Sequence, residues 1–249
     1  MTRRRWIADE VRGDTAALVG EHAAHLARVL RARVGQEFDI AAGDEVRRGT
    51  ITTISNDRIE FALDRIESSL GRKRLHGPKA DAPEITLALA IFKFDRMEWA
   101  IEKCTEIGVA RLIPVIARRT DAHLADAAVK RHERWQRIVR QASEQSRRAA
   151  VPEMAEPVTL KELVVDDGQS RVVLAESLAG SEENKGLRDV LQSGPSEVTL
   201  AVGPEGGWAD GELTWFYETG WTAASLGNTI LRAETAAIVA TALALDALR

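Results

Sequence analysis

The sequence predicts an α/β protein in which a parallel sheet with helices on both faces follows a smaller, β-rich N-terminal part. Two observations indicate this fold class. Near residue 80 the apolar pattern changes from short, partly alternating runs to apolar runs that are separated by amphipathic helices. The chain of 249 residues is also long for one domain, so two domains with ordinary cores are expected. Alternating strands and helices are typical of a parallel sheet that is covered on both sides.

The N-terminal part has the pattern of a compact β domain. Its runs EFDIAA (37–42), EVRRGTITTI (45–54) and DRIEFALDRI (57–66) alternate partly between polar and apolar residues and are separated by turn signals. The next stretch, SSLGRKRLHGPKADAP, is rich in Gly, Pro and cations, which is typical of a linker. We therefore expect one domain in residues 1–75 and a second in residues 76–249.

The second part is expected to supply the strands and helices of the parallel sheet. Its strand-like runs are ITLALAIF (85–92), ARLIPVIA (110–117), RVVLAES (171–177), EVTLAVG (197–203) and TAASLG (222–227). Helical spacing places Met97, Ile101, Cys104 and Gly108 on one stripe, and Trp135, Ile138, Val139 and Ala142 on another. Two further helices are expected near residues 210–219 and from about residue 232.

Composition limits the classes of protein that fit. With 45% hydrophobic and 29% charged residues, the chain has the balance of a folded globular protein. No apolar run approaches the ~20 residues of a membrane span, and no signal-peptide core follows MTRRRWIADE, so a cytoplasmic protein without a membrane partner is expected. The one cysteine excludes an internal disulfide and a Cys-rich zinc site. His22 and His25 have the spacing of two metal ligands but lack a third, and no metal is expected.

Charge is unevenly distributed along the chain. The formal net charge is −4, yet residues 1–80 carry 15 Lys and Arg against 12 Asp and Glu, a net +3, and residues 81–249 carry 19 against 26, a net −7. Within the acidic part, residues 130–148 hold seven basic and two acidic residues. Binding to phosphate groups depends on such local patches more than on the total charge. A solvated helix face is the simpler interpretation of the run taken alone.

The stretch AVGPEGGWADGE (201–212) leaves the carboxyl end of an expected strand, where open parallel sheets bind ligands. Gly203, Gly206 and Gly207 permit positive φ and a close backbone approach to a ligand, and Pro204 stiffens the turn. The Lys-Ser/Thr of a phosphate loop is missing, and no G-x-G-x-x-G follows a strand, so a nucleotide phosphate is not the expected ligand. An ordinary strand-to-helix turn is the alternative, and a second glycine loop after the next strand favours a site.

That second loop, SLGNTILRAETAA, opens the last expected helix. The helix dipole favours Glu234 in a first turn whatever the function of the protein. It disfavours Arg232, because a cation at a helix N-terminus faces an unfavourable field. Two interpretations account for this placement of Arg232: a functional role, or a salt bridge to Glu234, Glu205 or Glu176.

Five motifs follow one another along nearly the whole chain: HLARVLR, KFDRMEWAIEKCTEIGV, ERWQRIVRQASEQSRRAAVP, VGPEGGW and LGNTILRAETA. Together they resemble the ribosomal RNA small subunit methyltransferase E family, which are 16S rRNA uridine-N3 methyltransferases of the SPOUT class. The resemblance implies an N-terminal PUA-like β-barrel that binds RNA and a C-terminal domain with a deep trefoil knot, a rare exception to general topology rules. It also implies S-adenosylmethionine as the cofactor, a homodimer, and 16S rRNA in the 30S ribosomal subunit as the partner.

The resemblance further implies which residues form the site. The cofactor-binding positions are Leu174, Ala175, Glu176, Gly203, Glu205, Gly206, Gly207, Leu226, Gly227, Ile230, Leu231 and Arg232. The positions that we assign to RNA are Arg3, Arg4, Arg5, Arg28, Arg31, Arg118, Arg119, Arg147 and Arg148. Backbone groups in two glycine loops are suited to hydrogen-bond adenine, which accounts for the glycines without any phosphate.

The implied chemistry makes a specific demand on the protein. The N3 atom of uracil carries an imide proton and is a poor nucleophile until that proton leaves, and the negative charge then spreads to O2 and O4. A guanidinium stays charged and offers several donors, so Arg232 is the candidate that stabilises this charge. Glu234 either accepts the proton or orients Arg232, and the sequence does not separate these roles. Since N3 is occupied in a Watson–Crick pair, the target uridine must be unpaired or flipped out.

One position departs from the family pattern. The family usually has a basic residue directly before ILR, where Thr229 stands in this sequence. Arg118, Arg119 or the pair at 147 and 148 is expected to replace that cation, from the same or from a second subunit. Cys104 and Trp135 are expected to be packing residues, because both lie on apolar helical stripes and N3 methylation needs no covalent adduct.

Two other functions are compatible with parts of this pattern. A SPOUT enzyme that methylates another position, such as a ribose 2′-hydroxyl of tRNA or rRNA, would share the cofactor loops, although motifs outside the knot argue against it. A non-catalytic ribosome-assembly factor would bind rRNA through the β domain and would not depend on Arg232. We expect the assembled 30S particle to be the substrate, since a site built from two chains recognises a composite surface.

Overall fold

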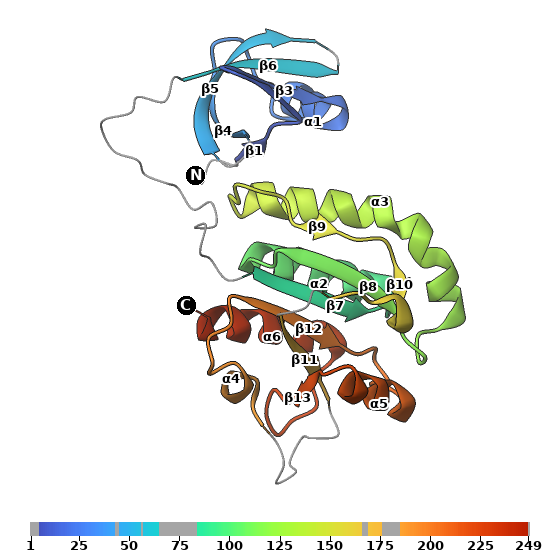
Figure 1. Ribbon diagram of the computed structural model, residues 1–249. Helices are drawn as coiled ribbons and strands as arrows, with labels where there is room; N and C mark the ends of the chain where they lie inside the picture. The colour runs from blue at the N-terminus through green and yellow to red at the C-terminus, as the bar shows by residue number, and fades with distance from the viewer. Residues whose placement is uncertain are drawn as a thin grey trace. The chain divides into compact units, whose positions relative to one another are not determined.

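The computed structural model describes residues 5–42, 45–55, 57–64, 84–165, 169–175 and 185–248. The chain divides into two compact units, Met1–Ala80 with Ser143–Val151 and Asp81–Ala142 with Pro152–Arg249 (Figure 1). The linker and the domain boundary that the sequence predicts lie outside the described residues.

The first unit is a curled sheet with two short helices. Its elements are β1 (Trp6–Ile7), β2 (Glu10–Arg12), β3 (Thr15–Val19), α1 (Gly20–Ala24), the π-helix η1 (His25–Val29), β4 (Glu37–Ala42), β5 (Glu45–Ile54) and β6 (Arg58–Leu63). The strand order is β1-β4-β5-β6-β3-β2, and the β1–β4 pair alone is parallel. The sheet is curled, as Figure 1 shows. Its core includes Trp6, Leu18, Leu26, Ile40 and Phe61. Because β1 and β2 end the strand order, the described sheet is an open half-barrel.

The second unit contains a parallel sheet. Its elements are β7 (Glu84–Ala90), α2 (Phe94–Ile107), β8 (Arg111–Ile116), α3 (Ala122–Gln145), β9 (Glu153–Met154), β10 (Val158–Thr159), the 3-10 helix η2 (Leu160–Glu162), β11 (Ser170–Leu174), α4 (Leu187–Val190), β12 (Glu197–Val202), α5 (Asp210–Glu218), β13 (Thr222–Ala224) and α6 (Ala233–Ala247). The strand order is β10-β8-β7-β12-β11-β13, with β9 beside β8, and every pair is parallel. The predicted fold class is confirmed.

Both faces of this sheet are buried, and strand β7 shows how. Ile85, Leu87 and Leu89 point into one apolar cluster, which contains residues of α2, α3 and α6, while Ala88 and Ala90 point into another with α5. Successive side chains of a strand alternate between the two faces, so one apolar run supplies both cores. The small alanines lie on the side where the large aromatic side chains of α5 and its neighbours pack.

The structure refines several predicted elements. The run predicted as a strand over residues 222–227 ends at Ala224, and residues 225–232 form a loop. Helix α3 ends before residue 147, where Arg147 has a φ of 61° and the N–H of Arg148 donates to the carbonyl of Ser143 at 2.9 Å. Such a left-handed residue closes a helix and usually is glycine. The short strands β1, β2, β3, β9 and β10 were not predicted, because their apolar runs are too short to show a period.

The trefoil knot stays a prediction. The segment at residues 185–187 runs parallel to the second glycine loop, with hydrogen bonds from the Ser225 N–H to the Lys185 carbonyl (3.0 Å) and from the Leu187 N–H to the Ser225 carbonyl (3.0 Å). The chain that leads from β11 to this segment, residues 176–184, lies outside the described residues.

Candidate functional site

Three neighbouring parallel strands end at the same edge of the sheet and form the floor of a cavity. Strand β11 lies between β12 and β13, with Val173 opposite Ala201 and Leu174 opposite Ala224. Just past the strand end, the N–H of Ala175 still donates to the carbonyl of Ala224 at 3.1 Å. The carboxyl ends of such strands, with the loops that follow them, are where open parallel sheets bind ligands.

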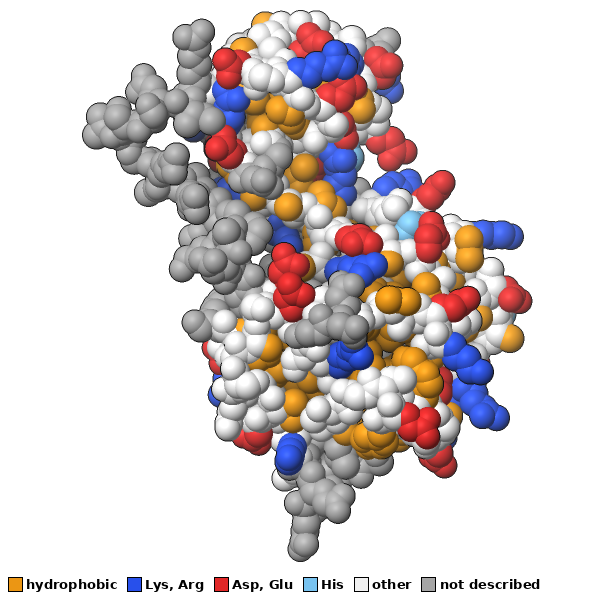
Figure 2. All heavy atoms as spheres, in the orientation of Figure 1, with side chains coloured by type: hydrophobic (Ala, Val, Ile, Leu, Met, Phe, Trp, Pro, Cys, Tyr) orange, Lys and Arg blue, Asp and Glu red, His pale blue; other side chains and the backbone are white. Residues whose placement is uncertain are grey.

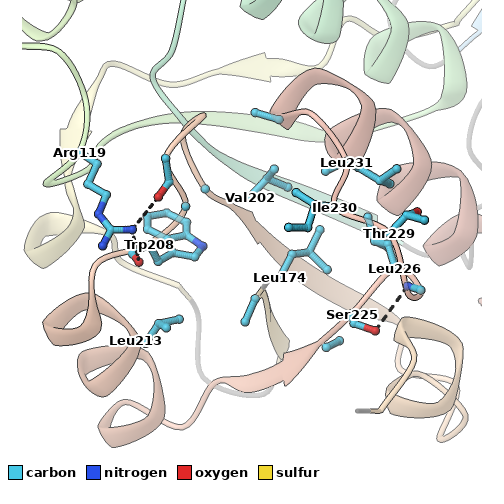
Figure 3. Close-up of a pocket in the computed structure, with 18 of the residues that line it drawn as sticks. Arg119, Leu174, Val202, Trp208, Leu213, Ser225, Leu226, Thr229, Ile230 and Leu231 are labelled. Atoms are coloured by element: carbon cyan, nitrogen blue, oxygen red, sulfur yellow. Dashed lines mark hydrogen bonds between the residues drawn. The ribbon is translucent and has the colours of Figure 1, made fainter. Parts of the chain in front are cut away.

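The cavity has a volume of about 230 Å³ and lies between the two glycine loops (Figure 3). Most of its wall is apolar side chain or glycine backbone, as in many sites for organic ligands. The lining residues are Arg119, Leu174, Ala175, Val202, Gly203, Gly206, Gly207, Trp208, Asp210, Leu213, Ala224, Ser225, Leu226, Gly227, Thr229, Ile230, Leu231, Ala233 and Ala236.

The first loop is a tight turn that the rest of the unit holds in place. The N–H of Gly207, whose φ is 68°, donates to the carbonyl of Pro204 at 2.8 Å. The guanidinium of Arg119 donates to the carbonyls of Gly206 (2.6 Å) and Trp208 (3.2 Å), as Figure 3 shows. A side chain at Gly206 would contact Arg119, with a Cβ only 3.4 Å from its Cδ. That contact is an ordinary one, so it is the positive φ of Gly207 that requires glycine in this turn.

Glu212 fixes the start of helix α5 beside this loop. Its buried carboxylate accepts hydrogen bonds from the N–H of Ala209 (2.8 Å) and of Arg118 (2.8 Å). The first bond satisfies a free amide at the helix N-terminus, and the second ties that terminus to the loop after β8. Charged acceptors make strong hydrogen bonds, so this side chain holds together two segments that flank the cavity.

The second loop presents backbone groups to the cavity. The N–H of Gly227, with a φ of 125°, donates to Ser225 Oγ at 3.4 Å. Within the described part of the chain, the backbone groups of residues 228–231 make no hydrogen bond. Thr229, Ile230 and Leu231 line the cavity, and Ile230 is 74% exposed. The loop therefore offers donors and acceptors that a bound ligand can use.

The structure brings together most of the cofactor positions that the sequence predicts. Nine of them line the cavity, namely Leu174, Ala175, Gly203, Gly206, Gly207, Leu226, Gly227, Ile230 and Leu231. Glu205 and Arg232 do not line it, and Glu176 lies outside the described residues. Among the lining residues that sequence reasoning missed, Trp208 and Asp210 had a visible signal, because they directly follow the glycines of the first motif.

Arg232 and Glu234 are separated in a way that the sequence does not reveal. Arg232 is the N-cap residue of α6, is exposed, and forms no ion pair or side-chain hydrogen bond with another described residue. Glu234 is 6% exposed, and its Oε1 lies 3.9 Å from Nε of Arg96. Arg96 also donates from Nη1 to Glu205 Oε1 at 2.8 Å. Arg96 of helix α2 thus links the first loop to the first turn of α6. A salt bridge from Arg232 to Glu234 or Glu205, the structural alternative to a functional role, is absent among the described residues, and Glu176 lies outside them.

The predicted RNA contacts divide into exposed and structural arginines. Arg28, Arg31, Arg118 and Arg119 are exposed, but the guanidinium of Arg119 binds the first loop. Arg3 and Arg4 lie outside the described residues. In the view of Figure 2 the coloured basic and acidic side chains are interspersed over the visible surface. Local arginines, rather than a broad basic face, are therefore the available contacts on that side.

Arg5 and the end of helix α3 require a correction. Arg5 is 4% exposed, its N–H donates to the carbonyl of Glu144 at 3.3 Å, and its guanidinium donates to the carbonyl of Arg147. Burial lowers the pKa of Arg148 to about 10. Arg5, which the sequence assigned to RNA, is therefore a structural residue, and Arg147 contributes its backbone carbonyl to that contact.

Cys104 and Trp135 have the packing roles that were expected. Cys104 is fully buried, and burial raises the pKa of its thiol to about 12, which rules out a reactive thiolate near neutral pH. Trp135 is buried in the core and contacts Phe94 edge-on. His22 lies 3.6 Å from Asp9, and the described residues contain no group of three potential metal ligands. None of the described helices is both long and apolar enough to cross a bilayer.

Comparisons with known proteins agree on one family. Residues 79–245 match the RNA methyltransferase domain model. A ribosomal RNA small subunit methyltransferase E from Synechocystis is 33% identical over 232 residues, covering 92% of this chain and 72% of the relative. The crystal structure of such an enzyme from Neisseria gonorrhoeae, bound to S-adenosyl methionine, covers 96% of this chain and 95% of its own (TM-score 0.77, 28% identity). A putative methyltransferase from Legionella pneumophila, in complex with the same cofactor, covers 99% and 98% (TM-score 0.82, 28% identity).

Proposed function

The chain belongs to the ribosomal RNA small subunit methyltransferase E family, and we propose that it transfers a methyl group from S-adenosylmethionine to N3 of one uridine in 16S rRNA. The observation that carries this proposal is the cavity at the ends of β11, β12 and β13, lined by the two glycine loops of the family motifs. When bound, the cofactor supplies an activated methyl group on a sulfonium.

The residues of the cavity fit this cofactor. Leu174, Val202, Leu226 and Leu231 give an apolar wall for a purine ring, and the second loop has unpaired backbone groups for its polar edge. The described cavity has no lysine, and Arg119, its one arginine, is occupied with the first loop. This wall is suited to an adenosine without phosphates.

Arg232 is the residue that we propose to stabilise the developing charge on the uracil ring. It lies between Leu231 and Ala233, which both line the cavity, and its guanidinium is free of described partners. A free guanidinium can donate to O2 or O4 as the N3 proton leaves, and it keeps its own charge throughout. Removing such a donor typically lowers the rate by about 10²- to 10³-fold.

Glu234 is proposed as a positioning residue. Because its carboxylate is buried against Arg96, it holds the first turn of α6 and thereby the backbone of Arg232. The alternative role is proton acceptor, for which its Oε2, unpartnered among the described residues, would have to reach the substrate. Glu234→Gln separates the roles, because an orienting contact tolerates an amide better than proton transfer does, and loss of the base would remove the corresponding limb of the pH–rate profile.

We propose that Arg28, Arg31 and Arg118 contact rRNA phosphates and that the protein acts as a homodimer. The three arginines are exposed and have no described ion-pair partner. Ile230 is exposed although it lines the cavity, so a second copy or the substrate would cover it. Light scattering at several protein concentrations tests the dimer.

A methyl-transfer assay tests the proposed reaction. The protein is incubated with labelled S-adenosylmethionine and 30S subunits from a strain that lacks the gene. The 16S rRNA is then digested to nucleosides, and the nucleoside that carries the label is identified. One 3-methyluridine per subunit is expected, with none for Arg232→Met on the same time scale. Label in 2′-O-methyl nucleosides would assign the protein to another SPOUT reaction. Tight rRNA binding without any label would indicate an assembly factor.

A further inference from the structure

Trp208 carries a hydrogen-bond donor that no described residue satisfies. Its side chain is 6% exposed, and its indole Nε1–H has no acceptor within the described part of the chain. The residue lines the cavity, and Figure 3 shows the indole nitrogen on the side of the ring that faces Val202 and Leu174. A buried donor without an acceptor is costly, and most such groups in folded proteins are paired.

The protein holds this ring in a defined orientation. The indole contacts Phe216 edge-on, with ring centroids 4.9 Å apart at 71°. A Cβ on Gly203 would lie 3.2 Å from Nε1, so glycine leaves the space that the indole occupies. Arg119 binds the backbone carbonyl of Trp208 itself. The donor therefore cannot turn to bulk solvent without loss of these contacts.

Burial of an indole N–H alone does not indicate a ligand. Trp135 also has an Nε1 without a described acceptor, but it lies in the core and does not line the cavity. Trp208 differs because its donor borders the space where a ligand fits.

We infer that Trp208 donates its indole N–H to the bound S-adenosylmethionine and is a recognition residue for it. This inference rests on the proposed function, since that function supplies the ligand. The cofactor offers acceptors of three kinds: the ring nitrogens of adenine, the ribose hydroxyls and the carboxylate. Asp210, two residues further along, also lines the cavity and adds an acceptor for the donors of the same ligand. The first loop thus offers the ligand polar side-chain groups as well as backbone groups.

Calorimetric titration of Trp208→Phe with S-adenosylhomocysteine tests this role. Phenylalanine keeps an aromatic ring but removes the N–H, and it leaves the acceptor of the ligand unpaired. We expect the dissociation constant to rise about 5- to 10-fold. Trp221→Phe is the matched control, because Trp221 contacts the same Phe216 (5.0 Å between centroids) but does not line the cavity, and its affinity should change less than about 2-fold.

Two further measurements complete the test. Titration with 5′-methylthioadenosine, which lacks the aminocarboxypropyl chain, locates the acceptor. A loss of affinity that persists places the acceptor on the adenosine, and a loss that vanishes places it on the aminocarboxypropyl chain. In the wild type, the indole resonance of Trp208, assigned among the six tryptophans by single Trp→Phe variants, should shift downfield and exchange more slowly when ligand binds. This readout remains available if Trp208→Phe does not fold.

Failure of the inference is distinct from failure of the proposed function. Equal affinity of Trp208→Phe and the wild type, or an indole resonance unchanged by saturating ligand, overturns the role of Trp208 while cofactor binding stands. Absence of any binding to the wild type overturns both.

Discussion

Arg96 is the residue whose replacement tests the architecture of the site most directly. It belongs to helix α2, yet it pairs with Glu205 of the first glycine loop and with Glu234 in the first turn of α6. Arg96→Met keeps most of the side-chain volume and removes the charge. We expect it to lower both the stability of the protein and the affinity of the cavity for S-adenosylhomocysteine, because the two segments that border the cavity lose their common partner.

The distances determine the size of the effect. Two unit charges about 4 Å apart attract by about 4 kcal/mol at an effective dielectric constant of about 20. Nε of Arg96 lies 3.9 Å from Glu234 Oε1, but the arginine side chain is 34% exposed. Solvent screening therefore reduces this attraction by about half, to about 2 kcal/mol. The pair with Glu205, which is 37% exposed, adds about 0.2–1 kcal/mol. We expect Arg96→Met to lower the free energy of unfolding by about 2–3 kcal/mol.

Urea denaturation followed by circular dichroism measures these values, and two variants serve as controls. Glu205→Gln breaks the exposed pair from its other end and should cost less than about 1 kcal/mol. Glu234→Gln in the Arg96→Met background removes the buried charge that has lost its cation. The double variant should therefore be more stable than the sum of the single changes predicts, by about 2 kcal/mol.

Two results would refute this reasoning. If Arg96→Met costs no more than Glu205→Gln, the contact with Glu234 does not contribute. If the changes at residues 96 and 234 are additive, the two side chains do not interact in solution, and the link from α2 to α6 has to be abandoned.

Three other predictions follow from the site. Arg232→Met should lower single-turnover methyl transfer by about 10²- to 10³-fold and leave the affinity for S-adenosylhomocysteine within about 3-fold, and a comparable loss of affinity would instead place Arg232 in the cofactor site. Arg118→Ala should weaken rRNA binding and reduce its salt dependence without an effect on the affinity for the cofactor. Arg119→Ala should mainly lower the affinity for the cofactor, because Arg119 holds the first loop. Filter binding measures the affinity for rRNA and calorimetry the affinity for the cofactor, and the reverse pattern would contradict the assignment. The Cys104 thiol should resist modification by thiol reagents in the native protein near pH 8, because burial raises its pKa to about 12. Since the neutral thiol is favoured in the folded state, its contribution to stability should be present below about pH 9 and be lost toward pH 12, and rapid labelling at pH 8 would show that the site opens.

Local patterns were sufficient to predict the architecture of the second unit. Apolar runs such as 85–92 and 197–203 became neighbouring strands, and the glycine loop after the second of these lines the cavity. Short-range rules act here, because a buried parallel strand needs a continuous apolar run and a ligand loop at its end needs glycine. The small strands β1, β2 and β3 of the first unit were not predicted, since runs of two to five residues are too short to show a clear period.

The partners of charged side chains could not be predicted in the same way. Glu234 lies two residues from Arg232 in the sequence, and the sequence suggested that one orients the other. In the structure Glu234 pairs with Arg96, which is 138 positions away, and Arg5 pairs with the carbonyl of Arg147 instead of reaching outward. An ion pair depends on distances of a few ångströms between side chains, and these follow from packing rather than from spacing along the chain.

The sequence by itself determined the fold class, the position of the two glycine loops and the family to which the chain belongs, because each depends on residues that are close together or appear in a fixed order. The tertiary structure alone decided which groups face the cavity. It placed the indole N–H of Trp208 at the cavity, left the guanidinium of Arg232 free of described partners, and buried the carboxylate of Glu234 against α2. The physical reason is that hydrogen bonding and burial are set by all the segments that meet at a point, here the ends of three strands and the starts of two helices.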